Sequence, residues 1–156
     1  MRAGEGEMTM TDLRDNVAAF HRAMEMNDPA TPKIPTDAVV RLRANLITEE
    51  YFETMRALFG TDEVFGEAEM AMQDFIAHAP VEPDLVEFAD GLADLEYVCE
   101  GAFLAFGIDS GPIHAEVQRS NMAKVGGEVR ADGKRLKPQG WTPPDIGGAI
   151  EAQRID

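Results

Sequence analysis

The sequence has little of what marks disulfide-stabilised, membrane-spanning or nucleic-acid-binding proteins. Its one cysteine, Cys99, cannot form an internal disulfide, so we expect a cytoplasmic protein. No apolar run is long enough to span a bilayer, and the first residues lack the apolar stretch of a signal peptide. Lys and Arg number 14 against 29 Asp and Glu, a net charge of −15. Such a surface repels nucleic acid polymers and anionic membranes, so neither is an expected partner.

Strand patterns and several common catalytic motifs are also missing. No segment alternates apolar and polar residues, and there is no internal repeat. The chain has no glycine-rich phosphate loop, no serine or cysteine nucleophile constellation and too few cysteines for a structural zinc site. None of the three histidines follows a glutamate by three residues, which argues against a di-iron bundle.

Helical periodicity is what the sequence does contain, and it predicts an all-α fold. Proline-rich or glycine steps separate expected helices, the fourth of which begins at Pro83 and the last, a short one, at Pro143-Pro144-Asp145. We predict a four- to five-helix bundle over residues 11–126, with a disordered N-terminus over 1–10 and an irregular C-terminal arm over 127–156 that closes over the site. The expected longer helices cover 11–26, 36–59, 61–78, 83–107 and 109–124.

The expected helix from 84 to 106 is apolar around most of its circumference. Such a helix requires burial on all sides, which a chain with few apolar helices does not provide by itself. The pattern therefore predicts an obligate oligomer. A homodimer is the smallest solution, and a higher homo-oligomer stays open.

Carboxylates occupy helix positions where apolar residues are expected. Glu49 and Glu53 fall within ~20° of Leu42 around the second helix, and Glu50 lies ~80° away, so the three glutamates continue a stripe that we expect to face the core. On the fourth helix, Asp90 and Asp94 share one face. Burying bare carboxylates is costly, and Mg²⁺ ligated by them would offset that cost. The alternative is that both are solvated faces of an acidic protein.

The acidic motif belongs to a wider resemblance. Glu49-Glu50-Tyr51-Phe52-Glu53, followed by Asp94, resembles the Glu-Glu-x-x-Glu and Glu-x-x-Asp signature of the MazG-like all-α NTP pyrophosphohydrolases. Segments 94–109, 115–124 and 130–145 look like a branch that contains phosphoribosyl-ATP pyrophosphohydrolase-like proteins and a dUTPase-like member. The match covers roughly residues 14–146, and its C-terminal arm is more specific than its acidic motif.

The resemblance implies a metal site and a reaction. Glu49, Glu50, Glu53 and Asp94 would ligate Mg²⁺, for which Mn²⁺ would substitute, and water would attack the α–β phosphoanhydride, with Glu50 as the candidate general base. One position departs from the signature, because Gly91 stands where the family has glutamate. Asp90 is the neighbour that could replace it, which leaves the number of bound metals open.

Positive charge is concentrated where the fifth helix gives way to the arm. Lys and Asn side chains there could bind the triphosphate and stabilise charge in the transition state, although a solvated basic patch is the alternative. Trp141 could stack on the base, but attachment of the arm to the helices is the favoured interpretation. Tyr97 and His21 are weaker candidates for a nucleoside pocket. The candidate substrate-binding residues are Arg119, Asn121, Lys124, Lys134, Lys137, Tyr97 and Trp141.

The leading hypothesis is a Mg²⁺-dependent pyrophosphohydrolase acting on a nucleoside triphosphate, with dUTP favoured. Phosphoribosyl-ATP is the alternative substrate, and a catalytically inactive dimeric relative that binds metal and nucleotide is the alternative from another class. Gly91 favours the inactive relative, whereas the intact trio of Glu49, Glu50 and Glu53 argues against it. Base preference and dimer against tetramer stay open.

Overall fold

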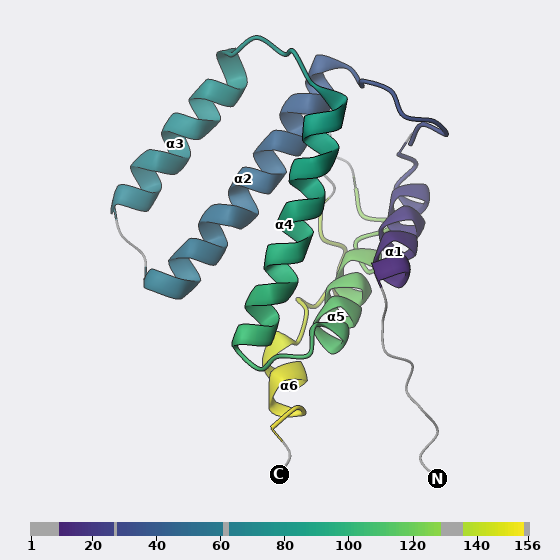
Figure 1. The fold of residues 1–156 in the computed structure, drawn as a ribbon. Helices are drawn as coiled ribbons and strands as arrows, with labels where there is room; N and C mark the ends of the chain where they lie inside the picture. The colour runs from purple at the N-terminus through teal and green to yellow at the C-terminus, as the bar shows by residue number, and fades with distance from the viewer. Residues whose placement is uncertain (1–9, 27, 61–62, 129–135, 155–156) are drawn as a thin grey trace. The chain divides into compact units, whose positions relative to one another are not determined.

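The computed structural model describes residues 10–26, 28–60, 63–128 and 136–154, and within them it contains six α-helices and no strand (Figure 1). The predicted all-α class is therefore confirmed. The structure divides into two compact units, one of residues 31–91 and one of residues 1–30 with 92–156. The helices are α1 (Met10–Ala23), α2 (Asp37–Phe59), α3 (Glu63–His78), α4 (Leu85–Ala105), α5 (Ser110–Met122) and α6 (Ile146–Glu151).

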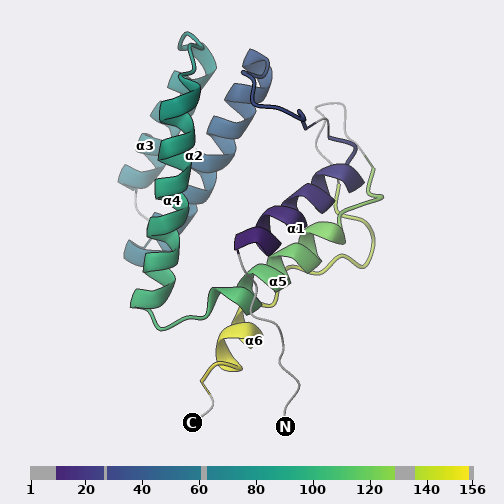
Figure 2. The same ribbon diagram turned by 45° about the vertical axis from the view of Figure 1, so that its right-hand side comes forward.

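In the unit of residues 31–91, α2 and α3 lie side by side (Figures 1 and 2). Thr36 takes an extended conformation before α2, and Gly60 ends the helix with a φ of 87°, a conformation that costs glycine little. The predicted bounds of this helix are confirmed. α3 ends at His78, before the Ala79-Pro80 step, because the residue before proline avoids the helical conformation.

Arginines on α2 hold it against α3. Arg41 donates to the carbonyl oxygens of Ile76 and Ala79, the latter at 2.9 Å, and thereby satisfies groups at the C-terminal end of α3 that have no partner within the helix. Arg56 forms an ion pair with Glu69 of α3, and its guanidinium lies 6.0 Å from the ring centroid of Phe52, which is buried.

The stripe predicted to face the core is not the packed face of α2. Leu42 and Leu46 are 52% and 41% exposed, and Glu49 and Glu53 are exposed as well. Phe52 is adjacent to Glu53 in sequence and so points ~100° away from it around the helix. The prediction of a buried stripe is wrong for the chain by itself, because the arginine stems and Phe52 occupy the face packed on α3.

In the other unit, α5 lies beside α1 and also packs against α6. Gln118 of α5 donates from Nε2 to the carbonyl oxygen of Asn16 in α1, at 3.0 Å. Asp109 accepts from the backbone N–H of Gly111 at 2.9 Å and caps α5. Gln153, just after α6, both accepts from and donates to the backbone of Asp109, which ties the end of the arm to the start of α5.

α4 begins two residues later than predicted. Leu85 is its first residue instead of Pro83, because the Asp84 carboxylate accepts from the backbone N–H groups of Val86 and Glu87 and so caps the helix. Many apolar side chains of α4 are exposed, with Val86, Tyr97 and Leu104 exposed by more than three quarters. No helix among the described residues has the length and apolarity to cross a membrane.

Candidate functional site

The three glutamates of the acidic motif lie in the C-terminal half of α2. Glu49 and Glu53 are one turn apart and Glu50 is three residues before Glu53, so all three lie within just over one turn of helix. Their exposed positions leave the carboxylates accessible to solvent and to ligands, which a catalytic group requires. The surrounding helix is regular, and Thr54 donates from its hydroxyl to the backbone carbonyl of Glu50 at 2.8 Å.

The two aspartates of the motif lie one turn apart on α4 and are also exposed. At Gly91, between them, a Cβ would meet no atom within 4 Å other than those of its chain neighbours and its own helix backbone, so a side chain has space there. Asp90 belongs to the unit of residues 31–91, together with the α2 glutamates, and Asp94 belongs to the other unit.

Carboxylate oxygens are the ligands that Mg²⁺ prefers, so the donor chemistry of these residues fits the metal. Over the parts of the chain that the structure describes, however, no three acidic, histidine or cysteine side chains come together closely enough to hold an ion. The assignment of Glu49, Glu50, Glu53, Asp90 and Asp94 as metal ligands therefore stays a prediction.

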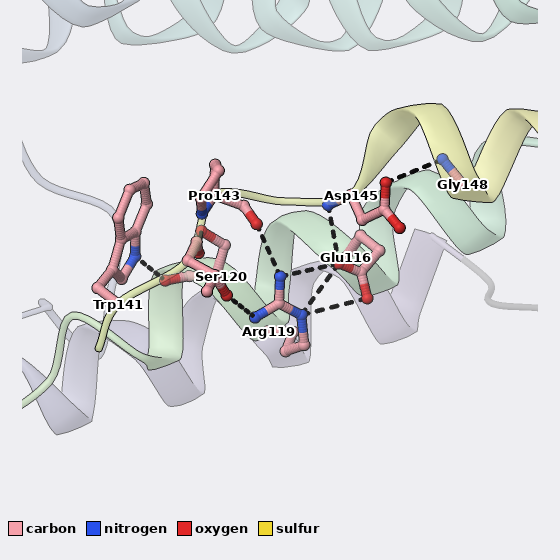
Figure 3. A network of polar contacts seen from close by, with 8 residues as sticks. Glu116, Arg119, Ser120, Trp141, Pro143, Asp145 and Gly148 are labelled. Atoms are coloured by element: carbon pink, nitrogen blue, oxygen red, sulfur yellow. Dashed lines mark hydrogen bonds and ion pairs between the residues drawn. The ribbon is translucent and has the colours of Figure 1, made fainter.

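The arm docks on α5 through Trp141, the only tryptophan of the chain (Figure 3). Its indole N–H donates to the carbonyl oxygen of Ser120 at 3.0 Å. Ser120 lies in the last turn of α5, where carbonyl groups have no partner within the helix, so the indole supplies one. The Ser120 hydroxyl in turn donates to the carbonyl oxygen of Thr142 at 3.2 Å, and Ser120 is only 2% exposed.

A second set of contacts joins α5 to the residues that follow Trp141 (Figure 3). Arg119 donates to the Thr142 hydroxyl at 3.1 Å and to the Pro143 carbonyl oxygen at 2.9 Å, and it pairs with Glu116 one turn earlier at 3.0 Å. Glu116 also accepts from the backbone N–H of Asp145 at 3.0 Å. Asp145 caps α6 by accepting from Gly148 N–H at 2.9 Å.

The charge of Glu116 is maintained by these partners. The Asp145 N–H first, and the Arg119 guanidinium next, hold the pKa of the Glu116 carboxyl below its ordinary value. The carboxylate therefore stays ionised near neutral pH, and the contact weakens only as the pH falls through that lowered pKa.

Two lysines gather at Trp141. The Nζ of Lys137 lies 4.0 Å from the ring centroid, and that of Lys124 lies 5.9 Å from it, both within the range of a cation–π contact. Lys124 also donates to the Asn121 side-chain oxygen at 2.9 Å. Four predicted substrate-binding residues are thus brought together: Lys124 and Lys137 contact Trp141, and Lys124 also contacts Asn121. Lys134 lies outside the described residues.

A pocket of about 240 Å³ adjoins this cluster, and Lys137 is part of its wall. Two of its lining residues are joined by a hydrogen bond of 2.7 Å from Leu136 N–H to the Glu128 carbonyl oxygen. Glycine is required at position 127, because a Cβ there would clash with the backbone carbonyl of Leu136. The lining residues are Gly126, Gly127, Glu128, Leu136, Lys137, Pro138 and Gln139.

The remaining candidates are placed elsewhere. Tyr97 is 81% exposed on α4. His21 contacts the carboxylate of Asp28 at 2.9 Å. Arg119, which was predicted to bind substrate, donates hydrogen bonds to Glu116, Thr142 and Pro143. Its contact with a substrate stays a prediction.

Sequence reasoning missed the residues that fix the arm, namely Glu116, Ser120, Thr142 and Asp145. The spacing of Glu116 and Arg119 by three residues on a helix was a visible sign of an ion pair. Nothing in the sequence showed that the same pair reaches residues 23 to 29 positions further along the chain, because such contacts depend on the tertiary path.

Comparison with known proteins agrees with the resemblance found in the sequence. The family model of phosphoribosyl-ATP pyrophosphohydrolase matches residues 17–121. A crystal structure of a protein from Exiguobacterium sp. 255-15, provisionally assigned as an NTP pyrophosphohydrolase, is 27% identical with a TM-score of 0.65. That comparison covers 91% of this chain and 93% of the other. None of the curated proteins matches. The family match includes both acidic stretches, whereas Lys137 and Trp141 lie beyond it.

Proposed function

Because the chain belongs to the phosphoribosyl-ATP pyrophosphohydrolase family, we propose that it is a Mg²⁺-dependent enzyme that cleaves nucleoside triphosphates between the α- and β-phosphates. The products are a nucleoside monophosphate and pyrophosphate. A pyrophosphohydrolase needs a binding site for a highly charged anion and carboxylates that manage metal and protons. The chain offers candidate residues for both tasks.

The observation that supports this proposal best is the lysine pair at Trp141. Two of the 14 basic residues of a chain with net charge −15 have their ammonium groups within 6 Å of the ring centroid of Trp141, which is itself bonded to α5. An anion that lies near this ring would be attracted by both ammonium groups, and a phosphate chain is such an anion. We assign Lys124 and Lys137 to the phosphates that the metal does not reach, with Asn121 orienting Lys124.

The carboxylates are assigned to metal binding and proton transfer. Glu49, Glu50, Glu53 and Asp94 are the proposed Mg²⁺ ligands, with Asp90 in place of the glutamate that Gly91 replaces. When bound, Mg²⁺ would neutralise phosphate oxygens and lower the pKa of water. Glu50 would take a proton from the water that attacks phosphorus, while the lysines stabilise the charge that develops on the leaving pyrophosphate.

Two substrates are considered. dUTP is favoured because the segments at 94–109, 115–124 and 130–145 resemble a branch with a dUTPase-like member. Phosphoribosyl-ATP is the second candidate, because the matching family model is named for that activity. Both contain the same phosphoanhydride, so the proposed chemistry is shared.

Pyrophosphate release measured with a panel of nucleoside and deoxynucleoside triphosphates and phosphoribosyl-ATP tests this function. We expect turnover in Mg²⁺, fastest with dUTP, and its loss in EDTA, with recovery in Mn²⁺, because the carboxylates need a hard cation. Fastest turnover of phosphoribosyl-ATP would replace dUTP with the second candidate. Binding without turnover of any substrate would identify the inactive relative and contradict the proposed activity.

We also expect a homodimer, because exposed apolar side chains along α4 would be buried in it. Light scattering at micromolar concentration should give about twice the chain mass of 17.1 kDa, or a higher multiple. Leu104→Glu on α4 should shift the protein toward monomers. Val64→Glu on α3, where an apolar side chain is also largely exposed, at 68%, is the matched control and should not. A wild-type monomer would contradict the expectation.

A further inference from the structure

The contacts between α5 and the arm differ in kind from an ordinary surface ion pair. Glu116 and Arg119 are three residues apart and would stabilise a helix slightly by themselves. Each residue also contacts the arm. Glu116 accepts from the Asp145 N–H, and Arg119 donates to the Thr142 hydroxyl and to the Pro143 carbonyl oxygen. Five polar contacts in total, including the two of Ser120, hold residues 141–145 against one helix face (Figure 3).

The segment between these contacts is stiff. Pro143 and Pro144 follow Thr142, and proline fixes φ near −65°. The two prolines restrict the backbone between Thr142 and Asp145, so contacts at both ends of this short segment constrain the place of Trp141. Trp141 is in turn the ring over which Lys137 lies at 4.0 Å and which Lys124 approaches at 5.9 Å.

We propose that Glu116 and Arg119 are positioning residues that fix the Trp141–Asp145 segment on α5 and so hold Lys137 and Lys124 at one ring as a binding site for the phosphate chain. This inference rests on the proposed function, in which both lysines bind phosphates. It adds that this ion pair determines the geometry of the site through its contacts with the arm. The charge on Glu116 strengthens its bond to the Asp145 N–H, since a charge-assisted bond is stronger than a neutral one.

The chain provides a matched control for this pair. Arg154 and Glu151 are also an arginine and a glutamate three residues apart, with a separation of 3.4 Å, and both are exposed by more than 70%. Their ion pair joins no second segment among the contacts that the structure describes. Substitution of Arg154 thus removes the same kind of local pair without touching the arm–α5 contacts.

The experiment compares Glu116→Ala, Arg119→Ala and Arg154→Ala by three measurements. Acrylamide quenching of Trp141 fluorescence reports the docking of the arm, because this is the only tryptophan. Calorimetric titration with inorganic triphosphate in Mg²⁺ reports phosphate binding without any need for turnover. Thermal unfolding reports folding. Glu116→Gln is added as the conservative variant, since it keeps an acceptor for the Asp145 N–H but loses the charge.

We expect Glu116→Ala and Arg119→Ala to increase quenching and to weaken triphosphate binding about tenfold, the lower end for loss of a charge-assisted contact. The KM for nucleotide should rise in parallel, with a smaller change in kcat. The quenching and triphosphate affinity of Glu116→Gln should lie between those of the alanine variants and the wild type. Arg154→Ala should match the wild type in both.

Unchanged quenching, or changed quenching with unchanged triphosphate affinity, would overturn the proposal. An equal loss of triphosphate affinity in Arg154→Ala would also overturn it, because the effect would then come from a change of charge anywhere on the chain. A wild type that does not bind triphosphate would overturn it too. If the wild type binds triphosphate and the variants lose it, but no nucleotide is hydrolysed, the positioning role stands and only the proposed catalytic function fails.

Discussion

Glu50→Gln should lower kcat for pyrophosphate release by roughly two to four orders of magnitude, the contribution typical of a general base. Glutamine keeps the size and polarity of the side chain but cannot take a proton from the attacking water. Glu50 is exposed on α2, so its replacement should leave the thermal unfolding temperature nearly unchanged. Pyrophosphate release in Mg²⁺ and thermal unfolding of the same samples check both parts.

Glu67→Gln is the control for this change. Glu67 is also an exposed glutamate on a helix of the same unit, but it lies on α3, outside the acidic motif. The control removes the same charge from a strongly acidic chain and should retain wild-type kcat. If Glu50→Gln and Glu67→Gln are equally active, Glu50 is not the general base, and another carboxylate of the motif or none has that role.

Lys124→Ala and Lys137→Ala should each lower kcat/KM by about one to two decades, because a lost charge-assisted contact costs ~1.5–3 kcal/mol when it persists in the transition state. Stability should change less than activity, since Lys137 is exposed and Lys124 is half-buried. Steady-state kinetics with Mg²⁺ and the preferred nucleotide, together with thermal unfolding, check this expectation.

Lys33→Ala is the matched control, because Lys33 is an exposed lysine in the segment before α2, away from Trp141 in sequence. It should retain wild-type kcat/KM. The double variant Lys124→Ala/Lys137→Ala should lose less than the sum of the single losses in free energy, because both lysines contact the same ring. Wild-type kinetics in all of these variants would show that the cluster at Trp141 is a solvated patch and not a phosphate site.

The contrast between the acidic motif and the lysine cluster has a physical basis. Glu49, Glu50 and Glu53 were found by spacing alone, because residues three and four apart in a helix share a face wherever the helix lies. The spacing could not show what that face contacts. Arg41, Phe52 and Arg56 occupy the side of α2 packed on α3, and Leu42 and Leu46 are left exposed. Long arginine stems can cover apolar surface, so an apolar pattern alone predicted the wrong face.

The sequence by itself determined the helices and several of their ends, because these depend on neighbouring residues. Asp109 and Asp145 cap helices that begin at the next residue, and Gly60 ends α2 with a positive φ. Only the tertiary structure decided that Trp141 donates to Ser120 and that Glu116 reaches Asp145, 29 residues away. Those contacts join segments whose separation along the chain has no periodic sign, so they arise only once the arm has folded back on α5. The lysines, identified as a basic stretch in sequence, meet at one ring for the same reason.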